Sequence, residues 1–364
     1  CPCALLITAT FTEGFVLNIF SKHGLFLKNA QVLQTIATID QVVFDKTGTL
    51  TRGEPAVTDI LVTTGFDEKQ VIGYAAALEK NSEHPLAQAI LRKAKADEIS
   101  FVAADKFTAV SGMGAKAFVQ NKSILMGNRH FVQSEGIAVD AWDEQAGPLS
   151  REGKTVVYVV LEKTVIGLIA LADTPKPSAK QTVENLKNRG LKVAMITGDN
   201  AGTAKAVAAQ LGIENVLADV LPGNKADEVR KLQSAGEVVA MVGDGINDAP
   251  ALAAVDVGIA IGAGTDVAIE TSDITLIRED LLGVPEAISL SEATMRVIRQ
   301  NLFWAFFYNV IGIPIAAGVL YPFFGILLNP EFAAAAMALS SFSVVSNSLR
   351  LRRIWGNTVS RQTA

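Results

Sequence analysis

Cysteine is scarce in this chain of 364 residues, which holds only Cys1 and Cys3, and histidine is nearly as rare. A disulfide between residues two positions apart would be badly strained, so a fold held together by disulfides is excluded and the two thiols are interpreted as a metal or redox pair. Basic charge is not in excess either, because the net charge is -5. The net charge therefore gives no indication of a nucleic-acid surface.

Charged residues of either sign are also few. They make up 19% of the chain against 49% hydrophobic residues, and the mean hydropathy is +0.31. This value is high for a soluble protein, so we expect a membrane part beside one or two soluble domains. The chain does not begin with Met, and no signal-peptide pattern opens it. We therefore expect a piece of a longer polypeptide.

A buried strand followed by a polar loop is predicted at residues 42–51, which read VVFDKTGTLT. The strand delivers Asp45 to its carboxyl end, where open α/β sheets place their chemistry. An aspartate there can attack a phosphoryl group if cations screen the repulsion between the two anions, and Lys46 and Mg2+ are the candidates. A polar turn without chemistry is the alternative.

Phosphoryl transfer also needs hydroxyl and amide donors and an ammonium group. A second predicted strand ends at Thr197-Gly198-Asp199, whose hydroxyl and backbone amides can contact phosphate oxygens. Lys225 can screen the group that is transferred. Taken alone, Asp199 could cap the helix expected at 201–211, and Lys225 could be a solvated helix lysine.

A magnesium site is predicted after the strand at 238–242. Asp244 and Asp248 are four residues apart across a turn, so both carboxylates can face one loop and bind Mg2+, which prefers oxygen ligands. A helix cap is the alternative role for Asp248. The repeated order of strand, polar loop and helix predicts a parallel sheet with helices on both faces.

The string DKTGTLT at 45–51, followed in order by these other segments, resembles the phosphorylation domain of P-type ATPases, which belong to the haloacid dehalogenase superfamily. The resemblance implies that Asp45 is phosphorylated by ATP and that Thr47 binds Mg2+ through its backbone. It implies Asp244 as the carboxylate partner of the ion, supported by Asn247 and Asp248.

Residues 55–171 interrupt this pattern and are predicted to form an inserted α+β domain. We expect helices at 68–79 and 84–96 and strands at 156–161 and 165–171. The second helix opens with Ser82-Glu83-His84-Pro85, and Ser82 is the expected cap.

The hexapeptide SEHPLA at 82–87 resembles the nucleotide-domain signature of the heavy-metal branch of P-type ATPases, which implies that Glu83 and His84 face the adenine. The family's glycine positions, which let a nucleotide lie against bare backbone, are matched by Gly112, Gly114, Gly127 and Asn128. A Gly-x-Gly pair is weak evidence alone. A further glycine of the family is replaced by Ala117.

Two long apolar runs, at 302–328 and 332–349, lie near the end of the chain. Arginines precede the first run and follow the second, so we predict a membrane hairpin with both outer ends in the cytoplasm. Residues 1 to about 20 are predicted to be half of a membrane-spanning helix. A buried helix of a soluble domain is the alternative.

The Cys1-Pro2-Cys3 segment predicts a soft-metal site, because proline frees a backbone carbonyl and thiolates select Cu+, Ag+ or Zn2+. Buried cysteines acting as small hydrophobic residues are the alternative. Together with Tyr308-Asn309 and Met337-x-x-Ser340-Ser341, the segment resembles the monovalent-copper subclass of heavy-metal ATPases. Neither apolar run holds the Lys or Asp of the zinc, cadmium and lead subclass. The implied Cu+ ligands are Cys1, Cys3, Tyr308, Asn309, Met337 and Ser341.

The predicted fold is a haloacid-dehalogenase-like α/β phosphorylation domain with an inserted α+β nucleotide-binding domain and α-helical transmembrane segments. The predicted boundaries are 1–29 for a half membrane helix with the metal site, 30–54 and 172–290 for the phosphorylation domain, 55–171 for the nucleotide-binding domain, 291–353 for the membrane helix pair, and 354–364 for the tail.

The predicted function is ATP-driven export of Cu+, with Ag+ as a second cargo, through an aspartyl phosphate. The expected cofactor is Mg2+, and the expected partners are ATP, Cu+ delivered by a copper chaperone, the lipid bilayer and the missing amino-terminal portion of the same polypeptide. A multi-pass protein of the plasma or inner membrane is expected, with its catalytic domains in the cytoplasm. The alternatives are a Zn2+- or Cd2+-exporting P-type ATPase, a membrane-anchored phosphatase with an aspartate nucleophile, and a passive metal-binding membrane module.

Overall fold

The computed structural model describes residues 3–362 except Asn81, Glu83, 111–112, 245–247, 263–265 and 326–328. Only the backbone is described for 3–11, 13, 266–268, 330, 332–333 and 352–362. Among the predicted site residues, Cys1, Glu83, Gly112 and Asn247 lie outside the described residues, as does the side chain of Cys3.

The chain divides into two compact units. Cys1–Val43, Glu184–Val193 and Pro222–Ala364 form the first, and Phe44–Val183 and Ala194–Leu221 form the second. The predicted insertion at 55–171 lies wholly within the second unit. The predicted domain boundaries stay a prediction.

A seven-stranded sheet is found among the described residues, with the order β1-β13-β12-β11-β2-β9-β10. Its strands are β1 (Leu25–Leu27), β2 (Gln41–Asp45), β9 (Lys192–Ile196), β10 (Asn215–Leu217), β11 (Val239–Gly243), β12 (Val257–Ile261) and β13 (Ile274–Leu276). The pairs β9–β10, β11–β12 and β12–β13 are parallel. The expected α/β fold is therefore confirmed. β1, which lies inside the predicted membrane segment 1–29, pairs antiparallel with β13.

The helices of this α/β part follow its strands, as expected of alternating units. They are α2 (Gln31–Ile36), α7 (Ala179–Asn188), α8 (Ala201–Leu211), η3 (Pro222–Asn224), α9 (Lys225–Ser234), α10 (Ala249–Leu252) and α11 (Asp266–Thr271). The bounds of α8 agree with the prediction. Its N-cap is Asn200, whose side chain accepts a hydrogen bond from the backbone N–H of Thr203, so Asp199 is not the cap.

The insertion is built on a second sheet, which has six strands among the described residues in the order β3-β8-β7-β6-β5-β4. They are β3 (Thr51–Val62), β4 (Asp105–Val110), β5 (Gly114–Val119), β6 (Lys122–Gly127), β7 (Thr155–Leu161) and β8 (Thr164–Pro175). The accompanying helices are α3 (Glu68–Glu79), α4 (Pro85–Ala96), α5 (Arg129–Ser134), η2 (Asp140–Trp142) and α6 (Asp143–Arg151). Neighbouring strands of this sheet run antiparallel throughout its described part.

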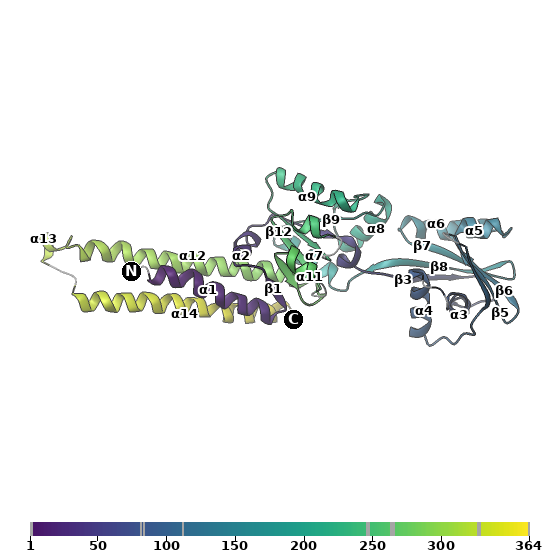
Figure 1. The fold of residues 1–364 in the computed structure, drawn as a ribbon, viewed down its shortest axis with the longest axis horizontal. Helices are drawn as coiled ribbons and strands as arrows, with labels where there is room; N and C mark the ends of the chain where they lie inside the picture. Colours follow the sequence, from purple (N-terminus) through teal and green to yellow (C-terminus); the bar gives the residue numbers. More distant parts are fainter. Residues whose placement is uncertain are drawn as a thin grey trace. The chain divides into compact units, whose positions relative to one another are not determined.

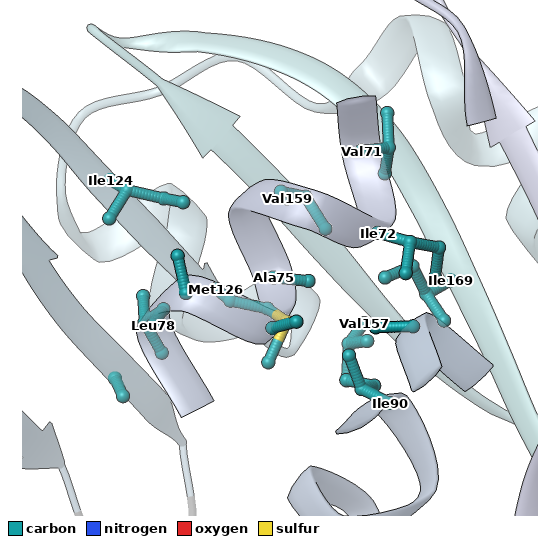
Figure 2. Close-up of a cluster of buried hydrophobic side chains, with 14 of the residues drawn as sticks. Val71, Ile72, Ala75, Leu78, Ile90, Ile124, Met126, Val157, Val159 and Ile169 are labelled. Carbon is teal, nitrogen blue, oxygen red and sulfur yellow. The ribbon is translucent and has the colours of Figure 1, made fainter. Parts of the chain in front are cut away.

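The core of the insertion lies between α3 and α4 and one face of this sheet (Figure 2). Ile72 and Leu78 of α3 and Ile90 of α4 are almost completely buried, and they pack against Val159 and Ile169 of the sheet. The apolar side chains of α3 recur at helical spacing, which is why its bounds could be predicted. The core holds the helix and strand ends that line the pocket described below.

Three helices lie side by side in the first unit (Figure 1). They are α1 (Cys3–Lys22), α12 (Gly283–Ala316) and α14 (Pro330–Gln362), with the short α13 (Tyr321–Phe324) between the last two. Buried hydrogen bonds join them: Asn301 Nδ2 donates to Ser348 Oγ at 3.0 Å, and the Ser348 and Thr12 hydroxyls are also 3.0 Å apart. These polar contacts set the register of the three helices.

The predicted apolar run 302–328 does not form one helix, because α12 already ends at Ala316. The helix stops there because Gly318, which follows the C-cap Ala317, takes a left-handed conformation with a φ of +84°. None of the helices in the described part of the chain combines the length and the apolar character needed to cross a membrane.

Candidate active site

The predicted nucleophile lies at the end of a fully buried strand. All five residues of β2 are buried, and Asp45, its last residue, is 5% exposed. The tight turn η1 (Lys46–Leu50) follows directly, and Thr51 then begins β3. A fully buried strand that ends on a carboxylate is unusual before a simple connecting turn, since a buried carboxylate requires compensating charge or hydrogen bonds.

The neighbouring segments of the second unit supply charged and polar groups. Lys46 is 5% exposed, and its ammonium donates to Oδ2 of Asp199, which follows β9. Thr197 is also buried, and its Oγ1 accepts a hydrogen bond from the backbone N–H of Asp199 at 3.1 Å. The structure thus brings together the two predicted segments at 45–47 and 197–199.

A further carboxylate, Asp173, was missed by the sequence analysis. Its two oxygens accept hydrogen bonds from Thr51 Oγ1 at 2.5 Å and from the backbone N–H of Gly53 at 3.0 Å. Burial raises the pKa of Asp173, opposed by the Thr51 hydrogen bond and the charge of Lys46. Asp173 lies near the end of β8 and Thr51 at the start of β3, so it ties the strand leaving the turn to the strand returning from the insertion.

In the first unit the predicted Lys225 and Asp248 form a buried ion pair. Nζ of Lys225 is 2.6 Å from Oδ1 of Asp248, and their side chains are 9% and 1% exposed. The alternative of a solvated helix lysine is therefore wrong. Asp248 stands at the N-cap of α10, but its side chain makes no capping bond. A Cβ on Gly243 would lie 2.5 Å from Asp248 Oδ2, so only glycine at 243 leaves room for this carboxylate.

A pocket of about 370 Å³ opens in the inserted domain. Four of the predicted nucleotide-site residues line this pocket: His84, Gly114, Gly127 and Asn128. His84, not Ser82, is the N-cap of α4, because its Nδ1 accepts from the backbone N–H of Leu86 at 3.2 Å. Ala117 lies outside the pocket lining and is buried in the core.

The two pocket glycines face each other across β5 and β6 in strict register. A Cβ on Gly114 would lie 2.2 Å from the carbonyl oxygen of Met126, and one on Gly127 would lie 2.5 Å from that of Met113. Gly114 also has a φ of +157°. The glycines are thus required by the close approach of the strands, in addition to the bare surface that they present to the pocket.

Glu79, which was not predicted from the sequence, lines the same pocket at the end of α3 and is 8% exposed. Burial raises the pKa of its carboxyl, while a hydrogen bond from Ser82 and the nearby His84 lower it. The sequence could have pointed to Glu79, because it is a glutamate at the last position of an otherwise apolar helix face. Such a residue is seldom buried without a function.

The comparisons with known proteins agree with this geometry. Residues 39–256 match the family model of the haloacid dehalogenase-like hydrolases. The probable copper-transporting ATPase PacS of Synechocystis sp. is 48% identical over 97% of this chain and 48% of its own length. A crystal structure of a zinc-transporting PIB-type ATPase in an E2.Pi state superimposes with a TM-score of 0.87 at 37% identity, over 96% of this chain and 56% of that one.

A structure of the catalytic domain of the CPx-ATPase CopB-B is 30% identical to this chain and superimposes with a TM-score of 0.55. The match covers 75% of this chain and 98% of that structure. The chain belongs to the P-type ATPases of the haloacid dehalogenase-like hydrolase family. It spans about half the length of the curated relatives that it matches.

The metal ligands predicted in the helical part of this P-type ATPase are only partly described. Asn309 Nδ2 donates to the carbonyl of Ala305 at 2.7 Å, and Tyr308 and Met337 are 41% and 50% exposed. Among the described residues there is no group of three or more His, Cys, Asp or Glu side chains placed to hold a metal. The roles of these residues as ligands stay a prediction.

We expect a Gly127→Ala variant of this P-type ATPase to bind ATP about tenfold more weakly. The added methyl would meet Met113 O at 2.5 Å and the ring of Phe131 at 2.6 Å, and such overpacking costs about 1–3 kcal/mol. Isothermal titration of ATP measures the effect. Gly73→Ala is the matched control, because its Cβ would lie 3.4 Å from Ile99, and unchanged ATP binding in both variants would contradict the prediction.

Glu79 predicts a pH-dependent stability. Because folding raises the pKa of this carboxyl above its ordinary value of 4.5, its stabilising contribution is present below that value and is lost as the pH rises through the raised pKa. Glu79→Gln imitates the protonated form. Its unfolding free energy relative to the unmodified chain should therefore increase between pH 5 and pH 8 in urea titrations. Equal differences at both pH values, or the same trend in the exposed Glu144→Gln, would refute the prediction.

Proposed function

We propose that the protein containing this chain uses ATP to export Cu+, with Ag+ as a second cargo, by way of a phosphorylated Asp45. The observation that carries the proposal is the buried Asp45 at the end of β2, followed by a buried Lys46 that pairs with Asp199 from the loop after β9. This arrangement supports a phosphoryl-transfer site, because it places a buried ammonium group on the residue next to the proposed nucleophile.

In the proposed reaction a carboxylate oxygen of Asp45 attacks the terminal phosphorus of ATP, the bond to the bridging oxygen breaks, and ADP leaves. Lys46 lies next to the nucleophile along the chain and supplies positive charge. Thr197 and Gly198 offer a hydroxyl and backbone amides to phosphate oxygens. Lys225 is proposed to act on the same phosphoryl group, which rests on the order of the motifs, since it belongs to the other unit.

Mg2+ fits the donor set that the sequence predicts for it. Oδ2 of Asp248 is buried and has no hydrogen-bond partner among the described residues, as a carboxylate oxygen reserved for a cation would be. Asp45, the Thr47 backbone, Asp244 and Asp248 are the residues proposed to hold the ion. When bound, Mg2+ supplies neutralisation of phosphate charge.

ATP is proposed to bind in the 370 Å³ pocket of the insertion, with its base near His84 and Glu79 and its remainder against Gly114 and Gly127. Pockets of this size, with mostly apolar walls and a few polar groups, are typical of ligand sites. Glu83 and Gly112 are proposed as further contacts from the resemblance alone.

The choice of cargo is supported by Cys1, Cys3 and Met337, since thiolates and thioethers prefer soft monovalent ions, and by the copper transport named for the Synechocystis relative. Zn2+ is the second candidate, because the structural relative is described as a zinc transporter. We propose a protein of the plasma or inner membrane with its catalytic domains in the cytoplasm, supplied with Cu+ by a copper chaperone.

The test is the ATPase activity of the complete protein in lipid vesicles with Cu+, Ag+ and Zn2+ in parallel. We expect stimulation by Cu+ and Ag+ and none by Zn2+. Stimulation by Zn2+ alone would overturn the cargo, and phosphatase activity that no metal stimulates would favour the anchored phosphatase. A Met337→Ala variant should lose the stimulation by Cu+.

A further inference from the structure

The surface of α12 carries a pocket of about 480 Å³ far along the sequence from the residues of the phosphorylation loop. Its lining includes Ala37, Arg296, Arg299, Gln300, Phe303 and Trp304. All of these residues belong to the first unit, and none has a role in the reaction proposed above. The chemistry of this lining changes along the helix from cationic to aromatic.

The two arginines are exposed and lie three residues apart, so they share one face of the helix. The natural partner of Arg296 would be Glu292, four residues earlier and also in the lining. Glu292 is engaged elsewhere, because its Oε2 accepts from Arg189 Nη1 at 3.2 Å. Within the described part of the chain neither Arg296 nor Arg299 has a carboxylate partner. The pocket is therefore cationic and open to an anion.

The next turns of α12 are aromatic and exposed. Phe303 and Trp304 are 61% and 46% exposed, and their rings touch edge to face with centroids 5.5 Å apart. Further exposed apolar side chains follow along the helix: Phe306, Phe307, Val310, Ile311 and Ile313. A continuous exposed patch of this kind marks an interaction surface. The order of arginine, tryptophan and aliphatic residues is the order in which a bilayer presents phosphate, interface and hydrocarbon.

We propose that this pocket binds the phosphate of an anionic phospholipid. The guanidinium groups of Arg296 and Arg299 match phosphate oxygens in a bidentate way. Gln300 offers an amide to the glycerol or headgroup oxygens. The acyl chains then lie along the exposed stripe that starts at Phe303 and Trp304. A free phosphate ion would use the arginines and leave the stripe uncovered, so the stripe favours a lipid as the source of the phosphate.

Trp304 provides the probe. The purified full chain in detergent is titrated with brominated phosphatidylglycerol or brominated phosphatidylcholine, and quenching of tryptophan fluorescence reports lipid contact. We expect stronger quenching at lower concentrations of the anionic lipid. Trp304→Phe should remove most of the quenching that depends on the headgroup. Trp142 and Trp355 remain in this variant and account for the rest of the fluorescence.

The decisive variant is Arg296→Gln/Arg299→Gln, which should lower the preference for the anionic lipid about tenfold or more, given the usual contribution of a basic residue at a membrane surface. Arg296→Lys/Arg299→Lys should keep part of this preference. Arg92→Gln/Arg230→Gln removes the same charge from exposed positions elsewhere and should leave it unchanged. Circular dichroism and urea unfolding confirm that each variant is folded.

An unchanged preference in the glutamine variant would overturn the proposal. So would displacement of the lipid by inorganic phosphate at equal concentration, because the pocket would then recognise the ion alone. Displacement by polyglutamate at low concentration would overturn it in favour of an acidic peptide as the ligand.

Discussion

An Asp45→Asn variant of the complete protein is expected to form no phosphoenzyme from radiolabelled ATP while it still binds ATP. The amide keeps the shape of the side chain but cannot form an acyl phosphate, so the covalent step is lost entirely. ATP binding should persist, because Asp45 is not among the residues that line the nucleotide pocket. Acid-stable incorporation of phosphate and titration with ATP measure the two properties separately.

The matched control for this experiment is Asp105→Asn, which removes an exposed carboxylate at the start of β4. It should be phosphorylated normally. Phosphate incorporation that survives in Asp45→Asn would show that another residue is the nucleophile. Loss of ATP binding together with phosphorylation would instead indicate that Asp45 is needed for the fold.

A Lys225→Met variant is expected to be strongly destabilised, by about 3–5 kcal/mol, because it leaves the charge of Asp248 buried without its partner. Asp248 is 1% exposed, and Nζ of Lys225 lies 2.6 Å from its Oδ1. The shift of the urea unfolding curve, followed by circular dichroism, measures the effect. Phosphoenzyme formation should also fall to background, since the proposed reaction uses both groups.

The double variant Lys225→Met/Asp248→Asn separates the structural role of the pair from its chemical role. Removing both charges should recover much of the lost stability without recovering phosphorylation. Lys231→Met is the control on the same helix, because its partner Glu228 is near the surface and an exposed pair contributes at most about 1 kcal/mol. A loss no larger in Lys225→Met than in Lys231→Met would contradict the prediction.

The elements that were predicted well have strong local signals. The helices at 68–79 and 201–211 combine helical spacing of apolar residues with clear ends, and both agree with the structure. The strand before Asp45 is short, apolar and β-branched, and it too was found. The boundary of α12 was not predicted, because its first turns are amphipathic and continue without interruption into the apolar run.

Residues that act through distant partners could not be found in the same way. Asp173 accepts hydrogen bonds from Thr51 and Gly53, about 120 residues away in the chain. No local sequence pattern predicts contacts over that separation. Glu79 stands in a helix that would form with or without it. His84 rather than Ser82 caps α4, since the geometry of the loop decides which of two competent side chains reaches the backbone N–H.

The sequence by itself determined the chemistry of this protein: an aspartate behind a buried strand, a lysine beside it and further carboxylates in fixed order are written in short motifs that need no neighbour to be recognised. Only the tertiary structure decided which of these groups are paired. Lys46 meets Asp199 and Lys225 meets Asp248 because the chain folds strands from distant segments into one sheet, and burial then makes each unpaired charge too costly to leave.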